Sequence, residues 1–196
     1  IQLLKTFKEC LNLDSKITFK SSSYSNQRYP HLQFGNVVLY NWLLEVGLMP
    51  AKSKIIGEIK MPDEYFFDFL RGVFDGDGSC HGYWDKRWAS SFMFYTIFYS
   101  ASEKFIFWLR DKITSQSQIK GNLQKTIRRK NSIMYQLKYA KRESKILYAK
   151  MYHQKSLPCL KRKQKKLESF LKTDTQEQER TLKLSDAYCN QVVSLV

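Results

Sequence analysis

A nine-residue stretch, Leu70 to Gly78, constrains this chain more than any other part of its sequence. The ten residues from Tyr65 to Phe74 contain only two polar side chains. The apolar residues between them are Phe66, Phe69, Leu70, Val73 and Phe74. These positions follow the i, i+3, i+4, i+7, i+8 spacing of a helix. A helix that is apolar on most sides is expected to be buried on more than one face.

The sequence also marks the ends of this helix. Asp63 follows a proline and is predicted to be the N-cap. Gly76 and Gly78 predict the C-terminal end, because glycine accepts the positive φ angle that terminates many helices. Gly72, in the middle, would allow another backbone to approach closely. The sequence therefore predicts a buried helix that carries Asp77 at its C-terminal tip.

Asp75 and Asp77 alternate with glycines at this tip. One interpretation is an ordinary turn, because Asp-Gly pairs are common turn formers. A calcium loop that began at Asp75 would place Cys80 where glycine is required and Lys86 where a bidentate glutamate is required, so this interpretation fails. A carboxylate at this end of a helix is disfavoured by the helix dipole unless a cation compensates it.

The sequence LRGVFDGDG at 70–78 resembles the LAGLIDADG motif of homing endonucleases, with seven of nine positions identical or conservatively replaced. Arg71 departs from the pattern, which has a small residue there. The resemblance implies that motif helices from two half-domains pack together. It also implies that Asp77, at the eighth position of the motif, binds catalytic metal together with the Gly76 carbonyl. Gly72, Asp75 and Gly78 are then structural positions of the motif.

Helical and strand periodicities indicate an internal duplication at a spacing of about a hundred residues, the size of a small domain. Residues 61–172 are predicted to run helix, hairpin, helix, hairpin, helix, the last a basic helix at 160–171. Residues 1–50 repeat only the end of this order: helix, strand, strand, helix. Chance similarity between such units is the alternative interpretation.

Together with the resemblance, this order predicts an α+β fold with an antiparallel, saddle-shaped β-sheet covered by helices. Residues 61–172 would form a complete second half-domain of the αββαββα type. Residues 1–60 would be a partial first half-domain without its motif helix and first hairpin, and residues 173–196 a C-terminal tail. The chain is thus expected to be of the two-motif monomeric type, truncated at the N-terminus so that only the second motif is present.

The positive charge is concentrated in one region. The net charge is +15, and between Lys120 and Lys166 sixteen Lys or Arg residues face the single acid Glu143. A solvated basic surface is one interpretation, and a polyanionic partner, double-stranded DNA or intron RNA, is the other. Membrane binding is not expected, since no stretch combines a basic region with a long apolar face. The longest apolar run, 92–99, is too short to cross a bilayer.

The four cysteines are far apart in the sequence, at Cys10, Cys80, Cys159 and Cys189. Their spacing suggests neither a zinc site nor a disulfide framework. This pattern and the lack of a signal peptide at Ile1 favour a reducing intracellular compartment, such as a bacterial cytoplasm or an organelle matrix, over secretion.

Two predicted hairpins would offer side chains to a DNA major groove, where base edges carry a full donor and acceptor code. Strand alternation places every second residue on the outer face. The outward candidates in the second half are Gln124, Thr126, Arg128, Lys130, Gln136 and Lys138, and those in the first half are Thr18, Lys20, His31 and Gln33. For each of them, an ordinary solvent-facing residue is the alternative.

The basic helix carries predicted phosphate contacts at Lys161, Arg162, Lys163, Lys165 and Lys166. Such contacts add affinity and salt dependence but no sequence preference. Lys141 lies where a strand is predicted to end and a helix to begin. In similar endonucleases a basic residue in this region reaches the reacting phosphate, where it can stabilise charge. The alternative is a surface lysine.

The resemblance implies sequence-specific cleavage of double-stranded DNA by hydrolysis assisted by Mg²⁺ or another divalent cation. The family uses one acid from each of two motif helices. The second half-domain would therefore come from upstream sequence or from another chain, and this chain alone is expected to be inactive. Two other functions stay open: an intron-encoded RNA maturase, and a non-catalytic DNA-binding regulator on the same scaffold.

Overall fold

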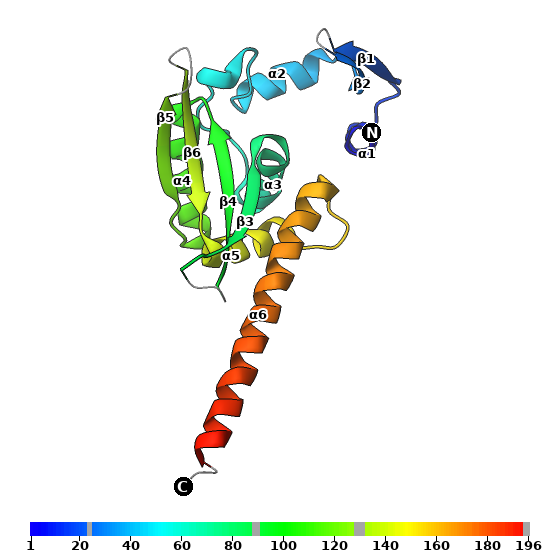
Figure 1. The fold of residues 1–196 in the computed structure, drawn as a ribbon. Coiled ribbons are helices and arrows are strands. Elements are labelled where there is room, and N and C mark those ends of the chain that lie inside the picture. Colours follow the sequence, from blue (N-terminus) through cyan, green and yellow to red (C-terminus); the bar gives the residue numbers. More distant parts are fainter. Residues whose placement is uncertain (23–24, 88–90, 128–131, 194–196) are drawn as a thin grey trace.

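The computed structural model describes residues 1–22, 25–87, 91–127 and 132–193 and shows an α+β architecture with antiparallel sheets (Figure 1). The helices are α1 (Gln2–Cys10), α2 (Val37–Glu45), α3 (Phe66–Asp77), α4 (Glu103–Ser117), α5 (Lys141–Met151) and α6 (Lys161–Val193). The strands are β1 (Ile17–Ser22), β2 (Ser25–Leu32), β3 (Ser79–Trp84), β4 (Phe92–Ser100), β5 (Asn122–Ile127) and β6 (Ile133–Tyr139). Two short 3-10 helices, η1 (Lys52–Lys54) and η2 (Asp63–Tyr65), precede α3.

The main sheet has four antiparallel strands in the order β3-β4-β6-β5. Helices α3, α4, α5 and the first turns of α6 pack against one of its faces. The core between sheet and helices contains fully buried side chains from every layer, including Phe74 of α3, Phe98 of β4, Ile106 of α4, Leu137 of β6 and Leu147 of α5. None of the helices that the structure describes packs against the other face of the sheet.

That second face is called the open face below. It presents Ser79, His81 and Tyr83 of β3, Tyr95 and Tyr99 of β4, Gln136 and Lys138 of β6, and Gln124 and Thr126 of β5. Strand alternation generates it, because Tyr135, Leu137 and Tyr139 are buried while the residues between them are not. The predicted inward and outward sets of β6 are thus confirmed for these positions.

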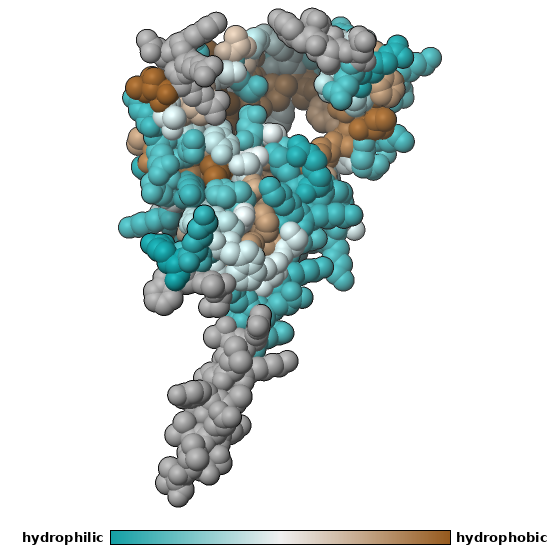
Figure 2. All heavy atoms as spheres, viewed as in Figure 1, coloured by the Kyte–Doolittle hydropathy of each residue, from teal (hydrophilic) through white to brown (hydrophobic). Residues whose placement is uncertain are grey.

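The N-terminal elements form a separate unit, with the strands β1 and β2 paired as a two-stranded sheet. Its order, α1-β1-β2-α2, is the predicted one and repeats the order α4-β5-β6-α5. None of the side chains described among residues 1–55 is buried, and large apolar ones such as Phe19, Tyr40 and Trp42 are about half exposed. Figure 2 shows apolar surface over this part of the molecule. The core therefore belongs to residues from Ile56 onward.

The structure corrects three expectations about the helices. Asp63 does not cap α3, because its carboxylate instead binds Lys112 and Gln116 of α4. The basic helix predicted for 160–171 continues unbroken as α6 through the expected tail to Val193. Among the described residues, α3 is covered on one side, since Phe66, Leu70, Arg71 and Phe74 are buried whereas Gly72 and Gly76 are exposed.

Gly72 in the middle of α3 and Gly78 directly after its end differ in what surrounds them, and this difference is testable. A Cβ at Gly78 would lie 2.7 Å from the Phe74 carbonyl oxygen, whereas nothing lies within 4 Å of a Cβ at Gly72. Gly78→Ala should lower the free energy of unfolding by about 1–3 kcal/mol through overpacking. Gly72→Ala should raise it by roughly 0.5–1 kcal/mol, because alanine loses less backbone entropy in a helix. Urea denaturation measures both, and equal effects would contradict the packing described for Gly78.

Candidate active site and nucleic-acid interface

Asp77, the last residue of α3, lies at an open cavity of about 580 Å³. The α3 side of the cavity is formed by Phe69, Gly72, Val73 and Gly76, and further walls come from the end of β4, from β6 and from the segment around η1. The side chain of Asp77 is exposed. Its carboxylate is therefore accessible to a ligand, in contrast to the fully buried aromatic rings of the same helix.

A single ammonium group binds the backbone carbonyl groups at the C-terminal end of α3, next to Asp77. Lys163 Nζ of α6 donates hydrogen bonds to the carbonyl oxygens of Phe74 at 2.7 Å, Gly76 at 3.2 Å and Gly78 at 2.6 Å. The last carbonyl groups of a helix have no partner inside the helix and carry the negative end of its dipole. A buried cation at this place satisfies them and offsets that partial charge.

This contact corrects the prediction for Lys163. Its side chain is 9% exposed, so the ammonium does not lie on the surface where a phosphate would meet it. Burial lowers the pKa of Lys163, with a further lowering from Arg162, while Asp75 and Asp77 act in the opposite direction. The neighbouring Lys161, Arg162, Lys165 and Lys166 are exposed, as expected for phosphate contacts.

The remaining polar residues of α3 bind the segment before α6. Asp75 Oδ2 accepts a hydrogen bond from the Leu160 backbone N–H at 2.7 Å, and burial raises the pKa of this carboxyl group. Arg71 donates to the carbonyl oxygens of Met151 at 2.8 Å and Pro158 at 2.9 Å. The residue that departs from the family pattern thus has a structural partner, and Asp75 is engaged as a structural residue.

Four of the six base contacts predicted for the second half lie together on the open face: Gln124, Thr126, Gln136 and Lys138. One row across the sheet contains Tyr99, Gln136 and Gln124, and the adjacent row contains Ser79, Ile97, Lys138 and Asn122. Thr126 pairs with Met134 in β6. Arg128 and Lys130 lie outside the residues that the structure describes. Gln124, Gln136 and Lys138 therefore form one polar surface, and Lys138 shares a cross-strand row with Ser79, two residues after Asp77.

The first-half candidates are on the N-terminal hairpin, away from the main sheet (Figure 1). Thr18 and His31 are cross-strand partners, and Lys20 lies two residues further along β1. Gln33 follows β2 and is exposed. The structure brings these four residues to one hairpin but does not join them to the open face.

Sequence reasoning missed an aromatic cluster on the open face, formed by His81, Tyr83 and Tyr95. The ring centroids of His81 and Tyr95 are 5.3 Å apart and those of Tyr83 and Tyr95 are 6.1 Å apart, with the rings nearly parallel. Lys138 Nζ lies 3.7 Å from the Tyr95 ring centroid. Burial lowers the pKa of His81, and Lys138 and Lys166 add to this effect. The alternation of β3 and β4 was the available signal, since it places all three rings on one side.

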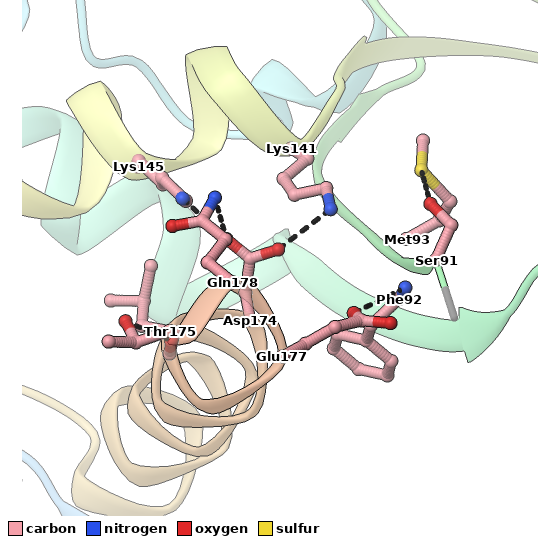
Figure 3. Close-up of polar contacts among 10 residues, drawn as sticks. Ser91, Phe92, Met93, Lys141, Lys145, Asp174, Thr175, Glu177 and Gln178 are labelled. Atoms are coloured by element: carbon pink, nitrogen blue, oxygen red, sulfur yellow. Dashed lines mark hydrogen bonds and ion pairs between the residues drawn. The ribbon is translucent and has the colours of Figure 1, made fainter. Parts of the chain in front are cut away.

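Lys141, the second predicted catalytic residue, points elsewhere. Its Nζ is 2.7 Å from Asp174 Oδ1 on α6, and Lys145 forms an ion pair with the other carboxylate oxygen (Figure 3). Asp174 is only 1% exposed. Burial opposes its ionisation, but the two ammonium groups outweigh this effect and hold the pKa of Asp174 below its usual range. Lys141 therefore links α5 to α6 on the helix-covered side of the sheet, while Asp77 faces the cavity.

A divalent cation would find only part of the predicted ligand set here. Asp77 offers an exposed carboxylate, but the Gly76 carbonyl already accepts from an ammonium that would repel a dication. Among the described residues, no three His, Cys, Asp or Glu side chains are grouped so as to hold a metal. The site therefore offers Mg²⁺ one ligand, the carboxylate of Asp77. Water, phosphate or a second carboxylate would complete the coordination shell of the cation.

No protein-family model, curated protein or solved structure matches this chain. The resemblance at 70–78 consequently rests on the residues of the motif themselves. Within the described part of the chain, no helix has the length and apolar character needed to cross a membrane.

The ion pairs of Asp174 give a prediction about stability. Asp174→Asn should lower the free energy of unfolding at pH 7 by about 1–3 kcal/mol, because it leaves two partly buried ammonium groups without their acceptor charge. The matched control is Glu179→Gln on the exposed side of α6, which should change stability by less than about 0.5 kcal/mol.

The same substitution has a pH signature. The folded-state pKa of Asp174 is depressed, so its contribution is present above the unfolded pKa of about 3.9 and is lost as the pH falls through the folded value. The difference between wild type and Asp174→Asn should therefore shrink in acid. A difference that stays constant from pH 7 to pH 2 would contradict the ion pairs.

Proposed function

We propose that this chain is part of a LAGLIDADG-type homing endonuclease that cuts double-stranded DNA at a specific sequence with the help of Mg²⁺. The observation that carries the proposal is the position of Asp77. Its exposed carboxylate lies at the tip of the motif helix, beside a cavity and at the end of a sheet face that carries basic and amide side chains.

The open face suits a duplex better than a small ligand. Glutamine pairs with adenine edges and lysine with guanine edges in the major groove, which are the residue types found at Gln124, Gln136 and Lys138. The exposed basic residues at the start of α6 supply contacts to phosphates, and the net charge of +15 favours association with a polyanion.

The roles of individual residues follow from their positions. Asp77 would hold the divalent cation, which supplies an activated water and neutralises developing charge on the phosphate. Lys138 serves as a base contact, because it lies on the open face in the same cross-strand row as Ser79, two residues after Asp77. Lys141 instead fastens α6.

The second half-domain of this enzyme would lie against the uncovered side of α3. That side presents Phe69, Gly72, Val73 and Gly76 to the cavity, and the small residues allow a second helix to come close. The second acid would come from that helix, supplied by upstream sequence or by another chain. Without it, this chain should bind DNA but not cut it.

One observation favours a second candidate, an RNA maturase. Parallel aromatic rings such as those of His81, Tyr83 and Tyr95 suit the stacking of unpaired bases, by which proteins recognise RNA loops. A maturase would speed excision of its intron and leave DNA intact.

The nuclease proposal is tested with the full-length gene product and a plasmid that carries the uninterrupted host gene. Cleavage should require Mg²⁺, and Asp77→Asn should lower its rate by roughly 10²–10³-fold, equivalent to several kcal/mol of transition-state stabilisation. The DNA affinity of the variant should stay within about threefold of wild type, which corresponds to a loss of less than about 1 kcal/mol of binding free energy. Faster intron excision without cleavage would favour the maturase, and DNA binding without either reaction would favour a regulator.

The open face is tested separately by DNA binding of this chain in a salt series. Lys138→Met should weaken binding to the preferred duplex by about 1–3 kcal/mol and relax specificity at one position. Lys161→Met should weaken binding to all duplexes and reduce the slope of log K against log salt by about 0.9. The charge-matched control, Lys150→Met on the helix-covered side, should do neither. Equal losses for Lys138→Met and Lys150→Met would count against the open face.

A further inference from the structure

The ammonium of Lys163 lies in a cradle of backbone carbonyl groups, which accept all the hydrogen bonds that it makes to described residues. Its three N–H bonds match three acceptors, the carbonyl oxygens of Phe74, Gly76 and Gly78, at 2.6–3.2 Å. The side chain is almost fully buried, and its Nζ lies 5.4 Å from the centroid of the Phe74 ring. An ammonium that makes all of its hydrogen bonds inside the protein is held in one place.

The cradle surrounds Asp77 in the sequence. Two of the three carbonyls, those of Gly76 and Gly78, belong to the residues immediately before and after it. The N–H of Gly78 also donates to the Phe74 carbonyl, which is the third acceptor of Lys163. The backbone on both sides of Asp77 is thus tied to one buried group, while its carboxylate stays exposed.

The segment just before Lys163 forms two further hydrogen bonds with α3. Arg71 binds the Pro158 carbonyl, and Asp75 accepts from the N–H of Leu160. Segment 158–163 therefore contacts α3 through its last two turns. These contacts fix the direction in which α3 ends, and the ammonium fixes the turn that follows.

We infer that Lys163 is a positioning residue for the proposed nuclease site. It holds Asp77 at the rim of the cavity before any metal ion or DNA binds. This inference rests on the proposed function. It changes the expected role of the divalent cation: the helix end already has its compensating charge, so the cation serves the carboxylate and the phosphate rather than the helix. It also removes the Gly76 carbonyl from the ligand set.

The first test needs neither a variant nor cleavage. In NMR spectra of the metal-free wild-type chain, the Lys163 ammonium should give slowly exchanging protons with couplings through the hydrogen bonds to the carbonyl carbons of Phe74, Gly76 and Gly78. The exposed Lys172 on the same helix should show neither property. Rapid exchange of the Lys163 ammonium, as at a surface lysine, would overturn the inference.

The second test replaces Lys163 by methionine, which keeps the length of the side chain but not its charge or donors. In the metal-free chain, Lys163→Met should shift the backbone amide and carboxyl resonances of Asp77, whereas Lys172→Met should leave them in place. Where Lys163→Met does not fold, Lys163→Arg retains the charge with a different donor geometry and should shift the same resonances. Unchanged Asp77 resonances in a folded variant would overturn the inference.

The third test separates this inference from the proposed function. In the active full-length protein, Lys163→Met should lower kcat by roughly 10²-fold, as a small misplacement of a reacting group does, with KM unchanged. Lys172→Met should change neither. If the wild type does not cut DNA, the proposed function fails while the resonances of Asp77 still decide whether Lys163 positions it. If kcat of a folded Lys163→Met protein equals that of wild type, the positioning role is overturned although the nuclease stands.

Discussion

Carbonyl groups at the end of a helix repel a carboxylate placed beside them, and α3 ends in such groups with Asp77 among them. The structure resolves this conflict with one buried ammonium, since Lys163 binds the carbonyls of Phe74, Gly76 and Gly78. Because that lysine belongs to α6, the C-terminal tip of α3 is bound directly to the long C-terminal helix. The carbonyl groups on both sides of Asp77 are thus bound by Lys163, while the Asp77 carboxylate stays exposed.

The main sheet divides the molecule into two chemical environments. On one face, α5 and α6 pack over the core, and Lys141 and Lys145 of α5 form ion pairs with the buried Asp174 of α6. On the other, amide, basic and aromatic side chains meet solvent. This division explains why two nearby lysines have different roles: Lys138 is the last outward residue of β6, and Lys141 begins the helix that turns to the covered side.

Local periodicity predicted what depends on local geometry. The alternation in β5 and β6 placed Gln124, Gln136 and Lys138 on one face, because a strand has a period of two whatever surrounds it. The roles of Lys163 and Lys141 could not be predicted in this way, since their partners lie 85–89 and 33 residues away. Part of the signal was present, because Lys163 shares a helical face with Leu167, Phe170 and Asp174. The run of basic residues around it and the early end predicted for α6 concealed that stripe.

The lack of buried side chains among the described residues 1–55 has a thermodynamic consequence. Fixing a backbone costs on the order of 1–2 kcal/mol of conformational entropy per residue, and burial of apolar surface is the main term that offsets it. Denaturant will therefore act on two regions of very different cooperativity. Any partner that covers Phe19, Tyr40 or Trp42 would couple its own association to the ordering of this region, so that binding and folding become one equilibrium.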